Sequence, residues 1–300
     1  MKKRPNSQVV YLIYLDESGD TGVRLDKPHA PKFDLVAALI YESRWVELER
    51  ELISLSLDIR ETLGLEETPR LHAWEMYQRR GAFAAVTDDQ RYSWIERALR
   101  AMHDARPIYH ARILDKADQL AYLADSPVAS QQDAATQGKA SYDPYVGYFG
   151  HLLIDLQAIL ERENELGIVF VDQHDRTRQL PRLNIYRAWR FVGIVDRLLE
   201  APVQLDGRQH SMLAIPDFVG YIYLAANRDK GRDRPRPYLA GWAQRYILPN
   251  VATYKPDAID VERLLAQGHF LMNWDEPSAD LAQTIAMVRV GFETLRRGNR

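Results

Sequence analysis

Hydrophobic residues follow two different spacings along the chain, and these spacings predict a series of strands and helices. Short apolar runs rich in Val, Ile and Tyr are typical of buried strands. Such runs occupy residues 8–15, 33–41, 107–114, 167–171 and 202–205. Apolar residues at every third or fourth position instead predict amphipathic helices. This second spacing occurs in residues 45–63, 88–103, 145–160, 185–199 and 216–227.

The order of these elements predicts an α/β domain. Strands that alternate with helices are typical of a mixed sheet flanked by helices, and the first two strands are expected to pair as a hairpin with a long connection. Because the stretch 228–237 is highly charged, we predict one domain over residues 1–228 and a C-terminal helical extension, residues 229–300, that packs on it. Residues 124–137 have no hydrophobic period, so we expect a loop or a partly ordered insertion there.

The composition restricts the chemistry that the protein can perform. Of 300 residues, 46% are hydrophobic and none is cysteine. The chain can therefore bury a core, whereas disulfides, thiolate zinc sites, iron–sulfur clusters and cysteine nucleophiles are excluded. The net charge of -3 rules out a protein that is basic all over, so any contact with nucleic acid must use local basic patches.

The N-terminus matches a secretory signal only in part. Lys2, Lys3 and Arg4 precede the apolar run 9–15, but acidic residues follow that run where a signal would have a small-residue cleavage site. No stretch approaches the roughly 18 apolar residues of a membrane span. We therefore expect a soluble, cytoplasmic protein without a membrane partner.

The Asp-Glu-Ser-Gly-Asp segment at residues 16–20 brings three carboxylates together at the end of a predicted buried strand. Strand ends are where a rigid scaffold presents functional groups. Asp172 follows a second buried strand. If the two strands are neighbours, about 4.8 Å apart, Asp16 and Asp172 converge and repel each other unless a metal ion or a proton relieves the repulsion. A polar turn that merely ends the strand is the alternative.

Two later segments add candidate residues. His72 and Glu75 lie three positions apart, so they share a face if the segment forms a helical turn. Asp217 directly follows Pro216 at a predicted helix start. Both segments also have a purely structural interpretation, because His–Glu pairs are common surface contacts and the helix dipole favours an acid in the first turn.

Together these segments resemble a large uncharacterised bacterial and phage family that is recognised by its N-terminal Asp-Glu-Ser-Gly motif. The resemblance covers about residues 8–228 and includes a His-x-x-Glu element, a strand-terminal aspartate and a late Leu-x-x-x-Asp helix. The family is assigned a ribonuclease H-like fold and is suspected to contain metal-dependent nucleases. The resemblance implies four metal-binding and catalytic carboxylates and a catalytic histidine: Asp16, Glu75, Asp172, Asp217 and His72.

The reaction that the resemblance implies is hydrolysis of phosphodiester bonds in nucleic acid by a two-metal carboxylate mechanism. Carboxylate ligands suit Mg²⁺ or Mn²⁺, and two ions are expected, with Asp16 bridging them and His72 orienting water or protonating the leaving group. Basic residues close to the second strand end would bind substrate phosphates. These are Arg176, Arg178, Arg182, Arg187 and Arg190. Further residues that could assist are Glu17, Ser18, Asp20 and Asp175.

Two other functions remain open at this stage. An Asp-x-Gly turn after a first strand also occurs in actin-like phosphotransferases, which bind nucleotides. Alternatively, the carboxylates are structural and the protein is a non-catalytic module that binds nucleic acid or protein. The sequence does not distinguish DNA from RNA as a partner, and it does not define the oligomeric state.

Overall fold

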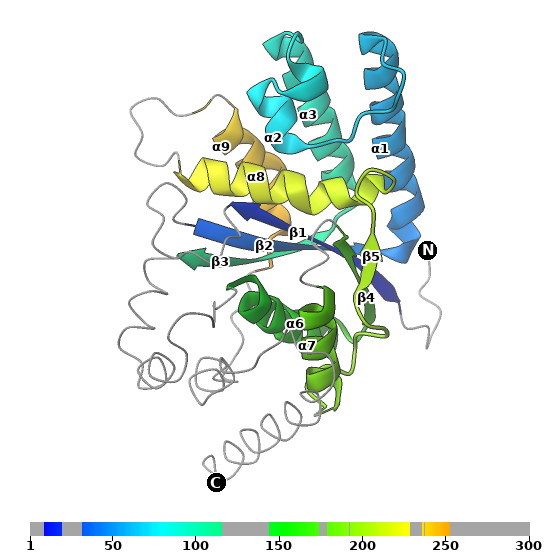
Figure 1. Ribbon diagram of the computed structural model, residues 1–300, viewed down its shortest axis with the longest axis vertical. Helices are drawn as coiled ribbons and strands as arrows, with labels where there is room; N and C mark the ends of the chain where they lie inside the picture. Colours follow the sequence, from blue (N-terminus) through cyan, green and yellow to red (C-terminus); the bar gives the residue numbers. More distant parts are fainter. Residues whose placement is uncertain are drawn as a thin grey trace.

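The computed structural model shows an α/β fold with a five-stranded mixed sheet between two layers of helices (Figure 1). This confirms the predicted α/β class and the mixed sheet flanked by helices. The structure describes residues 9–19, 32–115, 144–173, 179–191, 193–228, 236 and 238–252.

The sheet has the strand order β3-β2-β1-β4-β5. Its strands are β1 (Val10–Gly19), β2 (Lys32–Tyr41), β3 (Ile108–Asp115), β4 (Leu166–Asp172) and β5 (Val203–Leu205). β2 pairs antiparallel with β1 and β3, whereas β4 runs parallel to β1 and β5. All five predicted strands and the predicted hairpin are therefore confirmed, and β1 and β4 are neighbours.

Helices cover both faces of the sheet (Figure 1). They are α1 (Glu42–Leu63), α2 (Ala73–Gln78), α3 (Asp88–Asp104), α6 (Pro144–Glu163), α7 (Gln179–Phe191), α8 (Ala214–Arg228) and α9 (Leu239–Trp242). Figure 1 shows α6 and α7 below the sheet and the other helices above it. We call the two sides the α8 face and the α6 face.

Side-chain alternation along the strands assigns each residue to one of these faces. In β1, Ile13 and Leu15 belong to the core on the α6 face, whereas Tyr14 belongs to the core on the α8 face. In β4, Val171 lies in the core on the α6 face, and Phe170 packs against the core on the α8 face. The next residues on the α8 side are Asp16 in β1, which continues to Gly19, and Asp172 at the end of β4.

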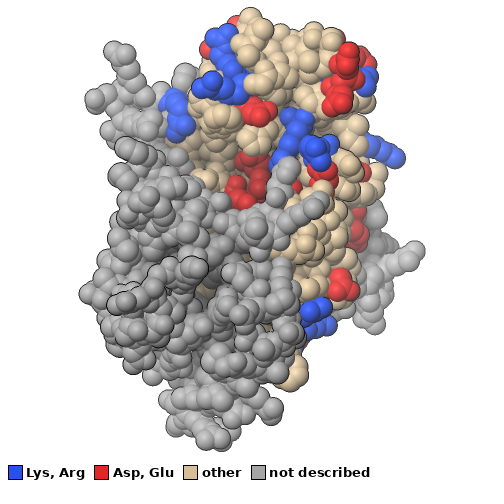
Figure 2. Space-filling view, in the orientation of Figure 1, with Lys and Arg blue, Asp and Glu red and all other residues tan. Residues whose placement is uncertain are grey.

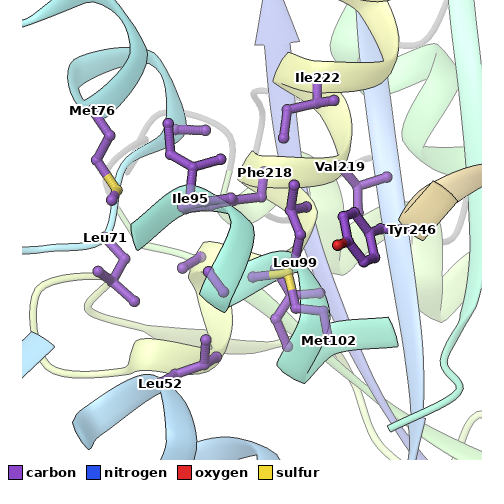
Figure 3. Close-up of a cluster of buried hydrophobic side chains, with 14 of the residues drawn as sticks. Leu52, Leu71, Met76, Ile95, Leu99, Met102, Phe218, Val219, Ile222 and Tyr246 are labelled. Atoms are coloured by element: carbon purple, nitrogen blue, oxygen red, sulfur yellow. The ribbon is translucent and has the colours of Figure 1, made fainter. Parts of the chain in front are cut away.

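The core on the α8 face holds α8 in place over the sheet. Figure 3 shows side chains from several helices converging there, including Leu52, Met76, Ile95, Leu99, Met102, Phe218, Val219, Ile222 and Tyr246. Gly220 allows close approach, because a Cβ at this position would lie 3.2 Å from Ser18 Cβ and from Val36 Cγ2. Helix α8 is thus fixed directly above the end of β1.

Two helix ends show how the sequence pattern works and where it misleads. Helix α1 ends, as predicted, at Gly64, whose left-handed conformation (φ 63°) caps the last turn. The helix predicted over residues 185–199 was too long, because α7 ends at Phe191 before Gly193, which has φ 75°. The apolar spacing continues past the helix because Val195 and Leu198 are buried core residues of an irregular segment.

Part of the predicted C-terminal extension is described, and it packs against the domain. After α9, residues 243–250 form a π-helical and a 3₁₀ turn, and Val251 forms a parallel bridge with Tyr109 of β3. Trp242 and Tyr246 join the same core as α3 and α8. The loop predicted over residues 124–137 lies outside the described residues. Within the described chain, no helix is both long and apolar enough to span a membrane.

Candidate functional site

Asp16 and Asp172 lie side by side where the parallel pairing of β1 with β4 ends. The strand predicted over residues 8–15 was too short, because β1 continues to Gly19 by pairing with β2. The register pairs Leu15 with Val171, so the next residue in each strand is an aspartate. Two positions earlier, the rings of Tyr14 and Phe170 stack on the α8 face, with centroids 5.1 Å apart. Because strand side chains alternate with a period of two, Asp16 and Asp172 extend this row toward the start of α8.

Asp217, in the first turn of α8, joins this row to the start of α2. Its Oδ2 accepts a hydrogen bond from the backbone N–H of Ala73 at 2.7 Å, and only 8% of the residue is exposed. Its Oδ1 lies 3.6 Å from His72 Nε2. Asp217 therefore stabilises the N-terminus of α2 and contacts the predicted catalytic histidine.

His72 is the N-cap of α2, and this determines its tautomer. Its Nδ1 accepts a hydrogen bond from the backbone N–H of Glu75 at 3.4 Å. The neutral ring consequently carries its proton on Nε2, which is the nitrogen that faces Asp217. The predicted His-x-x-Glu pair is thus the capping end of a short helix that points at the acids.

Glu75 lies at the edge of the same cluster. Its carboxylate lies over Gly81, where an added Cβ would be 3.5 Å from Oε2, and its negative charge raises the pKa of Asp217. Asp16, Glu75, Asp172 and Asp217 come from four separate elements, and we call them the acid cluster. Figure 2 shows acidic side chains gathered in the centre of the visible face, beside basic ones.

Burial and mutual repulsion disfavour ionisation within the acid cluster. Burial raises the pKa of Asp16 well above its ordinary value, and the charges of Asp217 and Glu17 raise it further. Burial also raises the pKa of Asp217, although His72 and the Ala73 N–H act in the opposite direction. Such carboxylates carry an electrostatic cost at neutral pH that nearby positive charge would reduce.

Arg70, in the loop before α2, supplies positive charge to the acid cluster, and the sequence pattern did not reveal it. Its Nη2 lies 3.2 Å from Asp172 Oδ2, and its charge lowers the pKa of both Asp16 and Asp217. A loop arginine has no hydrophobic period to mark it, and it becomes recognisable only when the fold places it among the acids.

The acid cluster has the donor chemistry of a magnesium or manganese site, but its arrangement does not fit one. Carboxylate oxygens are the ligands that these hard cations prefer. Among the residues that the structure describes, however, no three His, Cys, Asp or Glu side chains form a group that could hold a metal ion. The cation present within the acid cluster is the guanidinium of Arg70.

The other candidates, which are Glu17, Ser18, Asp20 and Asp175, are not members of the acid cluster. Ser18 lies on the α8 face beneath Gly220, and the backbone N–H of Glu17 donates to Asp16 Oδ1 at 2.9 Å. One further acidic residue, Asp34 of β2, was not predicted. It is fully buried and pairs in register with Ser18. A charged residue inside an apolar strand is the signal that could have identified Asp34. Asp20 and Asp175 lie outside the described residues.

Two of the arginines predicted to bind substrate have structural contacts. Arg182 is buried, and its Nη1 donates to the backbone oxygen of Asp172 at 3.2 Å. Arg190 Nη1 donates to three backbone oxygens of residues 195–198, at 2.9–3.3 Å. Arg187 is exposed on α7. Arg176 and Arg178 lie outside the described residues.

Two exposed side chains near the acid cluster were not predicted. Trp74, between His72 and Glu75, is 45% exposed and makes an edge-to-face contact with the His72 ring. Arg208 forms a two-pronged ion pair with Asp206, and the charge of Asp172 contributes to raising its pKa. The neighbourhood of the acids therefore offers an aromatic surface and a guanidinium to a ligand.

Comparisons with protein-family models, curated proteins and solved structures gave no significant match. The function must therefore be inferred from the chemistry of the acid cluster and its surroundings.

Proposed function

We propose that this protein is a nuclease with a ribonuclease H-like fold that hydrolyses phosphodiester bonds and requires Mg²⁺ or Mn²⁺. The observation that carries the proposal is the convergence of Asp16, Asp172 and Asp217 from β1, β4 and α8. The mixed sheet with helices on both faces supports the proposed fold. The resemblance in the sequence implies these same acids as metal ligands.

The electrostatics of the acid cluster support a requirement for a cation. The pKa values of Asp16 and Asp217 are raised, first of all by burial. A divalent cation would neutralise these carboxylates, but Asp16, Asp172 and Asp217 would have to rearrange to coordinate it, since the described side chains do not form a group that could hold a metal ion. Burying several carboxylates close together destabilises the folded protein. Carboxylates with shifted pKa values are typical of functional sites.

The surrounding side chains suit a nucleic-acid substrate. The exposed indole of Trp74 could stack on an unpaired base, an interaction that does not depend on base identity and contributes about 1–3 kcal/mol. Arg208 is exposed and could contact a phosphate. His72 carries its proton on Nε2, facing Asp217, and we propose that this N–H orients a water beside the acid cluster. A neutral imidazole N–H is too weak an acid to protonate the leaving oxygen.

The direct test is cleavage of labelled single-stranded DNA, duplex DNA, RNA and RNA–DNA hybrid in Mn²⁺ and in excess chelator. We expect cleavage of at least one substrate in Mn²⁺ and none in chelator. Asp16→Asn and Asp172→Asn should abolish cleavage. Asp104→Asn, at the exposed end of α3, makes the same chemical change outside the acid cluster and should cleave like the wild type.

Three outcomes would contradict the proposal. Equal cleavage by the wild type and Asp16→Asn would show that the activity does not come from the acid cluster. Absence of cleavage together with tight ATP binding in calorimetry would favour a nucleotide-binding phosphotransferase. If nucleic acid binds in excess chelator and no substrate is cut, the protein is a binding module.

A further inference from the structure

The ion pair between Arg70 and Asp172 is enclosed within the fold. Only 23% of the Arg70 side chain and 9% of the Asp172 side chain are exposed. The Nε of Arg70 is buried and has no hydrogen-bond partner among the described residues. Arg70 therefore gives up hydration to reach Asp172, which distinguishes this pair from the exposed ion pairs on α1 and α3.

The loop after β5 is shaped to fit this pair. A Cβ at Gly207 would lie 2.6 Å from Asp172 Oδ2 and 3.0 Å from Arg70 Cζ. Gly207 does not have a left-handed backbone, so close approach to these two side chains, not conformational freedom, is what requires glycine here. The packing around the acid cluster thus accommodates a guanidinium at Asp172.

The charge of Arg70 extends beyond its direct partner. It lowers the pKa of Asp16 and also that of Asp217. One arginine therefore compensates acids that come from three different elements. The compensating charge is that of a side-chain guanidinium, and the described residues form no group that could hold a metal ion.

We propose that Arg70 is the internal counter-cation of the acid cluster and that it competes with divalent cations for the carboxylate of Asp172. The inference rests on the proposed function only in assuming that a divalent cation binds these acids. A guanidinium nitrogen 3.2 Å from Asp172 Oδ2 occupies part of that carboxylate's acceptor capacity, and its positive charge repels an incoming cation. The wild-type protein should therefore bind Mn²⁺ weakly until Arg70 is displaced.

The test is a titration of the full-length protein with Mn²⁺ alone, without nucleic acid, followed by calorimetry and by the paramagnetic resonance of free Mn²⁺. Arg70→Gln should bind Mn²⁺ at least about tenfold more tightly than the wild type. Arg70→Lys, which keeps the positive charge, should stay within about threefold of it. Tenfold corresponds to about 1.4 kcal/mol.

The matched control is Arg208→Gln. This change removes the same charge from a neighbouring loop residue whose partner is Asp206. The Arg208 side chain is 73% exposed and paired with Asp206, so its influence on Asp172 is weakened by solvent and salt, and the variant's Mn²⁺ affinity should stay within about threefold of the wild type. Arg70→Met provides a second neutral variant if Arg70→Gln does not fold, as judged by circular dichroism.

The outcomes separate this inference from the proposed function. Tighter Mn²⁺ binding by the neutral Arg70 variants supports the inference even if no substrate is ever cleaved. Equal or weaker binding by these variants, or no Mn²⁺ binding by any of the proteins, would overturn it. Cleavage that depends on Asp16 would still support the nuclease proposal in that case.

Discussion

Gly207→Ala adds a single methyl group next to the acid cluster, and the structure allows its effect to be worked out. The new Cβ would lie 2.6 Å from Asp172 Oδ2, so the carboxylate must move by about 0.8 Å to reach an ordinary contact of 3.4 Å. The guanidinium carbon of Arg70, at 3.0 Å, must also yield. Both side chains are largely enclosed, which limits how far they can move.

The expected cost is that of overpacking a buried site. Forcing extra methyl groups into well-packed surroundings typically costs about 1–3 kcal/mol. A domain of this size loses about 2–4 °C in Tm for each kcal/mol, so Gly207→Ala should lower the Tm by about 2–12 °C. Because the Arg70 contact is weakened, the variant should also bind Mn²⁺ more tightly than the wild type.

The assay is thermal unfolding followed by circular dichroism, in chelator so that metal does not contribute. The matched control is Gly241→Ala in α9, where an added Cβ would have no atom within 4 Å. That substitution should be neutral or stabilise by up to about 1 kcal/mol, because alanine favours helices. A Tm for Gly207→Ala equal to that of Gly241→Ala would refute the described packing of Arg70 and Asp172.

Two further predictions concern ionisation. Burial raises the pKa of Asp16 well above 3.8, so its negative charge destabilises the folded protein at neutral pH. Asp16→Asn should therefore raise the Tm at pH 7. This gain in stability should fade on acidification, and urea unfolding at several pH values would check it. Burial, reinforced by Arg112, lowers the pKa of His151 from 6.5 to about 4. Unfolding should therefore become easier as pH falls from 6.5 to 4, with a loss of about 3 kcal/mol from this residue, and His151→Gln should remove much of that loss. A wild-type Tm at pH 7 equal to that of Asp16→Asn, or acid sensitivity unchanged in His151→Gln, would contradict these predictions.

The sequence predicted the elements that are built from hydrophobic pattern alone. The five strands and the helices α1, α3, α6 and α8 follow from apolar spacing, because the helices bury one side against a core and the central strands are short apolar runs buried on both sides. The end of α7 did not follow, because Val195 and Leu198 are buried in an irregular segment and imitate another helical turn. Apolar spacing indicates which residues are buried, but it does not show whether the backbone at those residues is helical.

The acid cluster could be predicted from the sequence only in part. Asp16 and Asp172 could be placed together because each ends a recognisable strand. The contacts of Asp217 with Ala73 and His72 could not be derived, since they depend on how α8 lies over the sheet. Arg70 has no pattern of its own, and its importance follows only from its position beside Asp172.

Asp217 connects the architecture of the site to its chemistry. The same carboxylate holds the first backbone N–H of α2 and faces His72 Nε2, so α2, the histidine and the acids keep a fixed relationship. Asparagine at this position could still accept the Ala73 hydrogen bond through its side-chain oxygen, but it would remove the negative charge. The structural and chemical roles of Asp217 can therefore be separated by two substitutions. Asp217→Ala removes both the cap and the charge, whereas Asp217→Asn keeps the cap and removes the charge. Asparagine keeps the Ala73 cap, but its amide nitrogen would then replace Oδ1 opposite His72 Nε2, so a purely structural cluster predicts a smaller loss of stability for Asp217→Asn than for Asp217→Ala.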